Sequence, residues 1–86
     1  MSAVEQVQTA EAIRANLTEF VEKQTKKPVT ADLDLFGSGL VSSLFALQLV
    51  VQVETAFGVA VEGPDLKLDN FRTIDTITDL VLRLAA

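Results

Sequence analysis

A long, mostly apolar run from Ser43 to Phe57 constrains this chain more than any other feature of its sequence. The run contains no proline, and Gly58 follows it directly. A fully buried strand is the alternative, but the run is too long for a typical strand. Serine before a helix and glycine after it are the usual residues at those positions. We therefore predict a helix over Ser43–Phe57, in which Leu49 is buried and the core stripe comprises Ala46, Leu47, Val50, Val53 and Phe57.

Two other stretches have the spacing of amphipathic helices. Apolar residues recur every three or four positions from Val4 to Phe20, which predicts a first helix over Val4–Thr25 that ends before Pro28. Near the end of the chain, Thr73 is a candidate capping residue. It is followed by a short apolar stripe made of Ile74, Ile77, Val81 and Leu84. The sequence thus predicts three main helices.

The segments between these helices differ in length. Lys26–Val41 is long, and we expect it to be an ordered loop held against the core by its apolar residues, Leu33, Leu35, Phe36, Leu40 and Val41. Asp65–Asn70 follows the break at Gly63-Pro64 and can form one short helical turn. The predicted fold is therefore all-α, a small four-helix bundle of three main helices and one short helix with a long first loop. A chain of 86 residues has room for one domain, 1–86.

The composition excludes several classes of function. The chain has no cysteine and no histidine, which removes thiol nucleophiles, Ser-His-Asp triads and the commonest nitrogen and sulfur metal ligands. We therefore predict no catalytic residues and no metal, so that the protein is not an enzyme. A net charge of −5 disfavours a nucleic-acid partner. The most apolar stretch, Leu44–Val53, is too short to span a membrane, and Met1–Glu5 lacks the pattern of a secretory signal, which favours a cytoplasmic location.

Two adjacent serines, Ser42 and Ser43, stand where the central helix is predicted to begin. One serine is enough to cap a helix by accepting hydrogen bonds from its free N–H groups. The second, Ser43, is expected in the first turn with its hydroxyl close to the exposed helix end. From the residues alone, a capping role and a chemical role both remain open.

The segment Gly39-Leu40-Val41-Ser42-Ser43-Leu44 resembles the motif that opens the second helix of the acyl carrier proteins. Phe57-Gly58-Val59 is similar to the usual end of that helix, and the resemblance extends over nearly the whole chain. It implies that Ser43 carries 4′-phosphopantetheine, derived from coenzyme A, through a phosphodiester. The thiol of this arm would hold an acyl group as a thioester. The family usually has aspartate before the modified serine, where this chain has Ser42, so Ser42 is both the expected helix cap and the competing attachment site.

A narrower resemblance concerns the cargo. Common fatty-acid carriers have acidic residues where this chain has Phe45 and Gln48. The segments 43–50 and 69–75 look like discrete carriers of antibiotic and polyketide pathways, in particular those that hold methoxymalonyl or hydroxymalonyl extender units. This implies a free-standing acyl carrier of secondary metabolism that presents an activated acid to tailoring enzymes. A carrier of an aminoacyl or peptidyl starter unit is one alternative, and an unmodified helical interaction module is an alternative of a different class.

The exposed side of the central helix is expected to meet the partner enzymes. The candidate contact residues are Leu44, Phe45, Gln48 and Val51, with Glu54 at the rim. Phe45 has an alternative place in the core, against the long loop. The resemblance implies a monomer whose partners are a phosphopantetheinyl transferase, an acyl-loading enzyme, and an acyltransferase or polyketide synthase.

Overall fold

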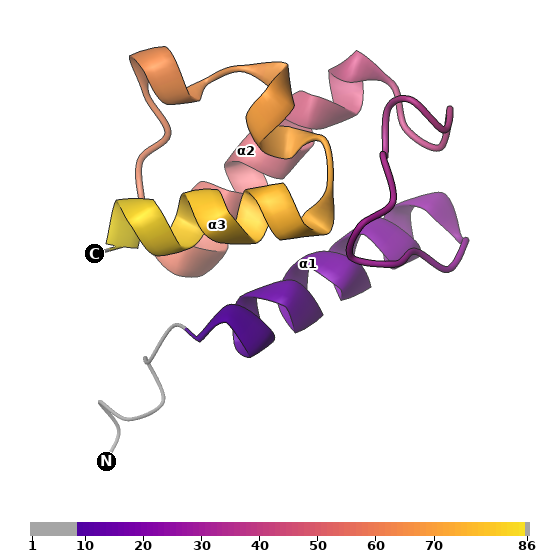
Figure 1. Ribbon diagram of the computed structural model, residues 1–86, viewed down its shortest axis with the longest axis horizontal. Helices are drawn as coiled ribbons and strands as arrows, with labels where there is room; N and C mark the ends of the chain where they lie inside the picture. The colour runs from indigo at the N-terminus through magenta and orange to yellow at the C-terminus, as the bar shows by residue number, and fades with distance from the viewer. Residues whose placement is uncertain (1–8, 86) are drawn as a thin grey trace.

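The computed structural model describes residues 9–85, and its regular elements are all helical. The α-helices are α1 (Ala10–Thr25), α2 (Ser43–Phe57) and α3 (Ile74–Ala85). Two short 3₁₀ turns, η2 (Gly63–Asp65) and η3 (Leu68–Phe71), lie between α2 and α3. In Figure 1, α3 lies against both α1 and α2, and the long first loop joins α1 to α2. The predicted all-α fold is confirmed, and α2 has the predicted bounds.

The start of α1 differs from the prediction. Thr9 has an extended backbone, and its side-chain oxygen accepts a hydrogen bond from the N–H of Ala12 at 3.0 Å. Thr9 is therefore the N-cap, and α1 begins at Ala10. Val4 and Val7, on which an earlier start was predicted, lie outside the described residues.

The start of α3 is fixed by two threonines that cap each other's backbone. The Thr73 hydroxyl accepts a hydrogen bond from the N–H of Thr76 at 2.9 Å. In return, the Thr76 hydroxyl accepts one from the N–H of Thr73 at 3.0 Å. The predicted capping role of Thr73 is confirmed, and Thr76 completes a reciprocal arrangement of the capping-box kind.

Both α1 and α2 end in the same way. The residue after each helix is left-handed: Lys26 has φ 62° and Gly58 has φ 67°. Its N–H donates to the carbonyl of a glutamate four residues earlier, Glu22 or Glu54. The carboxylate of the same glutamate accepts a hydrogen bond from the backbone N–H of a buried valine seven residues further on. The Val29 N–H donates to Glu22 at 2.9 Å, and the Val61 N–H donates to Glu54 at 2.8 Å. Each glutamate therefore ties the departing chain back to its own helix.

The connection between α2 and α3 contains two 3₁₀ turns where one short helix was predicted over Asp65–Asn70. Pro64 lies inside the first turn, which it favours because its φ is already fixed. Lys67 then has an extended backbone (φ −141°), which interrupts the helical geometry. The Asn70 side chain donates a hydrogen bond to the Asp65 carbonyl at 2.8 Å, so the two turns are held together.

The core lies where the three helices meet. Its fully buried members include Ile13, Leu17 and Val21 of α1, Leu49 and Val53 of α2, and Ile74, Ile77, Leu80 and Val81 of α3. Phe71 of η3 and Leu35 of the first loop complete it. The one polar residue of this core, Thr78, donates its hydroxyl proton to the Ile74 carbonyl at 2.8 Å. The buried hydroxyl therefore has a partner and costs little.

The predicted core stripe of α2 is wrong at Leu47, whose side chain is 62% exposed. Leu49 is fully buried as predicted, whereas Phe57 is only half-buried. The reason is that α2 is apolar on most of its circumference, with Glu54 as its one charged residue. Its uncharged polar residues Gln48, Gln52 and Thr55 form only a narrow stripe, which constrains the rotation weakly, and the packing of Leu49 and Val53 decides which side faces inward.

The first loop is ordered and held to the core, as predicted. Leu35 is fully buried, and its N–H donates to the Arg72 carbonyl at 2.8 Å. The N–H of Asp75 donates to the Ala31 carbonyl at 2.9 Å. These two bonds attach the loop to the start of α3, which fixes the approach of the chain to α2.

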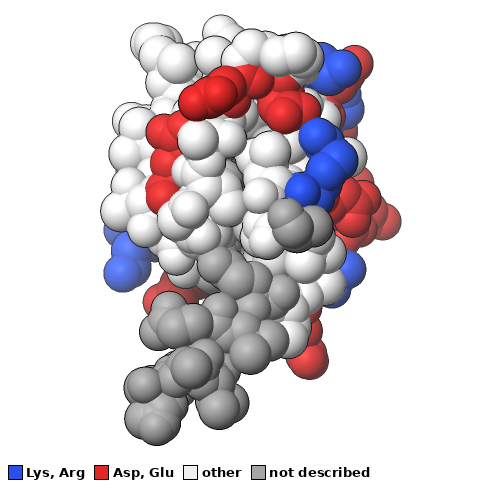
Figure 2. Space-filling model, turned by 90° about the vertical axis from the view of Figure 1, so that its left-hand side faces the viewer, with Lys and Arg blue, Asp and Glu red and all other residues white. Residues whose placement is uncertain are grey.

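The surface is acidic overall. Figure 2 shows one face on which a band of acidic side chains crosses the upper part above a largely uncharged centre. The ion pairs among residues 9–85 are made by arginines, namely Arg14, Arg72 and Arg83. No helix in this part of the chain is long and apolar enough to cross a membrane.

Candidate functional site

Ser43 is the first residue of α2, and both it and Ser42 are exposed. Ser42 has the N-cap position with an extended backbone, but its side chain makes no capping hydrogen bond, contrary to the prediction. The N–H of Phe45, which such a cap would serve, instead donates to the Ser42 carbonyl at 2.9 Å. Within residues 9–85, neither serine hydroxyl takes part in a hydrogen bond, so both are available for chemistry.

The surroundings of Ser43 fit a phosphate ester. The first N–H groups of a helix have no partners within it, and the helix dipole gives this end a partial positive charge. The first turn of α2 contains no acidic residue, so nothing there repels an anion. A polar hollow of about 370 Å³ borders Ser42, with Gln24, Lys27 and Gln48 in its lining. An arm attached at this end of α2 therefore has both space and favourable electrostatics.

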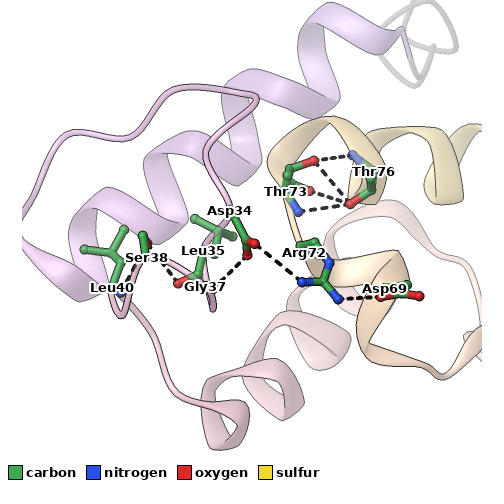
Figure 3. Close-up of polar contacts among 9 residues, drawn as sticks. All are labelled: Asp34, Leu35, Gly37, Ser38, Leu40, Asp69, Arg72, Thr73 and Thr76. Atoms are coloured by element: carbon green, nitrogen blue, oxygen red, sulfur yellow. Dashed lines mark hydrogen bonds and ion pairs between the residues drawn. The ribbon is translucent and has the colours of Figure 1, made fainter.

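The loop before α2 is fixed by Asp34. Its carboxylate accepts a hydrogen bond from the N–H of Gly37 at 2.8 Å and forms an ion pair with Arg72 at 3.4 Å (Figure 3). A Cβ at position 37 would collide with the Asp34 carboxylate, so a larger residue there would displace this carboxylate from its contacts. The Ser38 hydroxyl donates to the Leu35 carbonyl at 3.3 Å, and it accepts from the N–H of Leu40 at the same distance. These contacts fix the turn over residues 34–40, which precedes Ser43.

Arg72 joins this turn to η3. Its guanidinium contacts both the Asp34 and the Asp69 carboxylates (Figure 3). The hydrogen bond from Gly37, together with Arg72, holds the pKa of the Asp34 carboxyl below its usual value. Arg72 does the same for the pKa of Asp69, and the two carboxylates raise the pKa of Arg72. Sequence reasoning missed this cluster, because Asp34 lies 38 residues from Arg72 in the chain.

The exposed side of α2 is apolar. Leu44, Leu47 and Val51 are 73%, 62% and 61% exposed, and Gln48 is exposed beside them. Two of the predicted contact residues lie differently. Phe45 is half-buried against Phe20, and the Glu54 carboxylate is bonded to the N–H of Val61. Sequence reasoning missed Leu47 because it assigned this residue to the core.

A groove of about 140 Å³ lies between α2 and the segment that contains η2 and η3. From α2 it is lined by Ala46, Leu47 and Val50, and from the other side by Leu66, Lys67, Leu68 and Phe71. Sequence reasoning did not find it. The exposed leucines at positions 66 and 68 on either side of a lysine were the available signal. No group of three or more residues within 9–85 is arranged to hold a metal ion.

The all-helical bundle and the exposed serine at the start of α2 agree with the carrier domain expected from the sequence. The chain belongs to the phosphopantetheine attachment site family, whose model matches residues 11–81. It is 28% identical over 74 residues to the D-alanyl carrier protein of Streptococcus sanguinis (strain SK36), a match that covers 84% of this chain and 94% of the relative. No solved structure matches it.

Membership of this family settles the cofactor. The domain carries a covalently attached 4′-phosphopantetheine group, as expected from the sequence. Carrier domains are not catalytic themselves. They interact with a phosphopantetheinyl transferase and with acyl-loading or synthase enzymes.

Proposed function

We propose that this protein is a free-standing acyl carrier of secondary metabolism that is not itself an enzyme. It holds an activated acid as a thioester on an arm linked to Ser43. It presents this acid to tailoring enzymes and then to an acyltransferase or polyketide synthase. The single observation that carries the proposal is the unbonded, exposed Ser43 hydroxyl at an N-terminus free of acidic residues.

The attachment step uses this hydroxyl. Its oxygen forms a new bond to the phosphorus of coenzyme A that bears the pantetheine, and 3′,5′-ADP leaves with the electrons of the broken P–O bond. The hydroxyl proton passes to a base of the transferase, because the first turn of α2 has no carboxylate and the chain has no histidine. The helix N-terminus stabilises the anionic phosphodiester that results. We prefer Ser43 to Ser42 because Leu44 follows it directly, as in the acyl carrier motif.

We further propose that partner enzymes dock on the exposed apolar side of α2. Leu44, Leu47 and Val51 supply apolar area next to Ser43, and Gln48 lies among them. Such contacts contribute most when they are central in an interface and fully desolvated. Because Phe45 and Glu54 already have partners within the chain, their role in docking is to support this surface rather than to contact the partner.

The cargo has two candidates. The resemblance of residues 43–50 and 69–75 to carriers of methoxymalonyl or hydroxymalonyl units supports a substituted malonate. The similarity to a D-alanyl carrier protein supports an aminoacyl unit instead. The two differ in charge, because a malonyl group ends in a carboxylate and an alanyl group has an ammonium.

Intact mass spectrometry tests the attachment. After incubation with coenzyme A and a broad-specificity phosphopantetheinyl transferase, we expect a mass increase of one phosphopantetheine. Ser43→Ala should abolish it, and the matched variant Ser42→Ala should retain it. Labelling of Ser43→Ala together with loss of labelling in Ser42→Ala would move the site to Ser42. A folded protein that takes no label would instead support an unmodified interaction module.

A further inference from the structure

We infer that the polar hollow between the end of α1 and the start of α2 holds the phosphate end of the arm, and that Lys27 is the cation that pairs with its phosphodiester. This inference rests on the proposed function, because it requires an arm on Ser43. It goes further by assigning a positioning residue, one that binds the arm but takes no part in attaching it.

The lining of the polar hollow matches the phosphate half of the arm. This half consists of an anion, a branched hydrocarbon group, a hydroxyl and an amide. Lys27 is the one charged residue of the lining, which contains no carboxylate although the chain has a net charge of −5. Gln24 and Gln48 have amides that both donate and accept hydrogen bonds, and Leu40 supplies apolar area. Each chemical group of this half of the arm therefore has a suitable partner in the lining.

The polar hollow begins next to the attachment residue. Ser42 borders it directly before Ser43, and Gln48 lines it from α2, about 7.5 Å from Ser43 along the helix axis. Ser43 itself is not in the lining, so the arm enters the hollow by bending around the start of α2. Since Ser43 is the first residue of α2, no helical turn blocks this path.

The volume of the polar hollow suits the phosphate end rather than the whole arm with its cargo. The hollow measures about 370 Å³, which corresponds to about twelve water molecules at about 30 Å³ each. This is enough for a phosphodiester and the groups next to it. The thiol end of the arm therefore stays outside, where partner enzymes can reach it.

The ammonium of Lys27 is available to an anion. Lys27 is exposed, and it forms no ion pair in the part of the chain that the structure describes. The carboxylates nearest to it in sequence have other partners. Glu22 accepts a hydrogen bond from the N–H of Val29 at 2.9 Å, and Asp32 accepts one from the Thr30 hydroxyl at the same distance. Lys27 is therefore a cation without a counter-charge at the edge of the hollow.

The covalent attachment makes this contact effective. An ion pair between exposed groups is weak when its partners meet from solution. A phosphate attached at Ser43 is held close to Lys27, which raises its effective concentration there. The contact therefore does not immobilise the arm, but it favours departure of the arm from α2 on the side of α1.

The experiment observes both partners of the proposed contact. The ¹⁵N-labelled protein is converted to the holo form with coenzyme A and the transferase, and intact mass is measured first. Changes in amide shift between apo and holo forms are recorded for the side chains of Gln24 and Gln48 and the backbone of Lys27. We expect these changes to be at least twofold larger than the average over α3. The ³¹P resonance of the phosphodiester should differ from that of the holo protein unfolded in urea.

The variants Lys27→Met and Lys26→Met separate this lysine from charge in general. Lys26 is the adjacent cation and does not line the polar hollow. Lys27→Met should at least halve the changes at Gln24 and Gln48 and move the ³¹P resonance toward its unfolded value, whereas Lys26→Met should leave both unchanged. Lys27→Arg should restore both, because a guanidinium also pairs with phosphate. Salt at about 1 M should act on the original protein as Lys27→Met does, since the contact is exposed to screening.

Several outcomes would overturn the inference. They are equal effects of Lys27→Met and Lys26→Met, no effect of Lys27→Met, and shift changes confined to Ala46 and Val50, which do not line the polar hollow. Failure to load the arm contradicts the proposed function itself. Successful loading without any dependence on Lys27 contradicts only the inference drawn here for this lysine.

Discussion

The ring of Phe45 on α2 stacks on that of Phe20 on α1, with centroids 5.8 Å apart and an angle of 22° between the ring planes. This contact holds the start of α2 against α1 next to Ser43, the proposed attachment residue. It also explains why the Phe45 side chain is only half-exposed, although it lies two residues after Ser43 on a helix with an open apolar side.

Replacing Phe45 with aspartate tests this contact. We expect Phe45→Asp to lower the free energy of unfolding by about 2–3 kcal/mol, because it removes the ring pair and places a charge in a half-buried position. Chemical denaturation followed by circular dichroism measures the change. The neighbouring variant Leu44→Asp, at a residue 73% exposed, should stay within about 0.5 kcal/mol of the original protein. Similar values for the two variants would show that the Phe20–Phe45 contact contributes nothing.

Leu49 and Leu47 form a matched pair on the same helix. Leu49 is fully buried and Leu47 is 62% exposed. We expect Leu49→Ala to lower the free energy of unfolding by about 2–5 kcal/mol, since it leaves a cavity in the core. Leu47→Ala should change it by about 0.5 kcal/mol or less but should slow transfer of the cargo to a partner enzyme. A large loss of stability for Leu47→Ala would contradict the exposed position of this residue and indicate that it packs in the core.

Substitution of Glu54 tests the hydrogen bond that holds the chain after α2 to the end of this helix. Its carboxylate accepts a hydrogen bond from the N–H of the buried residue Val61 at 2.8 Å. Glu54→Ala should therefore lower the free energy of unfolding by about 1–2 kcal/mol, because the valine N–H loses its partner. Glu54→Gln should recover part of this, since its amide oxygen can still accept. The exposed variant Glu62→Ala is the control, and an equal effect at both positions would contradict a specific role for Glu54.

The Arg72 cluster makes stability depend on pH. The pKa values of Asp34 and Asp69 are lowered in the folded protein, so the folded state favours the ionised forms. Their contribution is fully present above the ordinary carboxyl pKa of 3.8 and is lost as the pH falls below it. We expect Arg72→Gln to be less stable than the original protein at about pH 6 and to lose less on acidification to about pH 3. Urea unfolding at both values measures this.

The control for Arg72 is Lys23→Gln, which removes the same charge from the exposed side of α1. This variant should lose as much unfolding free energy on acidification as the original protein does. If Arg72→Gln lost as much stability as the original protein between the two pH values, the lowered pKa values would not arise from this cluster.

The features that sequence predicted well have local causes. The end of α2 follows from Gly58, where a left-handed φ of 67° favours glycine. Its start was predicted correctly, although the Ser42 side chain makes no capping hydrogen bond. The cap was likewise predicted from one residue, Thr73, and the ordered first loop from the apolar residues within it. The end of α1 shows the limit of such signals, since Lys26 takes a left-handed φ of 62° without being glycine.

The features that sequence missed depend on contacts between distant segments. The exposure of Leu47 was not predicted, because apolar residues surround most of α2 and its narrow polar stripe does not show which apolar side faces the core. Similarly, the ion pair between Arg83 and Asp65 joins residues eighteen positions apart, so no local pattern predicted it. Sequence located the candidate attachment serines; the surface that surrounds them required the structure.

The unequal burial of the helices has a consequence for local opening. α3 buries Ile74, Ile77, Thr78, Leu80 and Val81, whereas α2 buries only Leu49 and Val53 over its described length. Segments with fewer buried contacts open at lower free energy, so the amide protons of α2 should exchange with solvent before those of α3. The helix that begins at Ser43 is therefore the one that can separate from the bundle while α1 and α3 stay packed. An enzyme that binds the arm therefore contacts a helix that opens locally at low free energy, while α1 and α3 stay packed against each other.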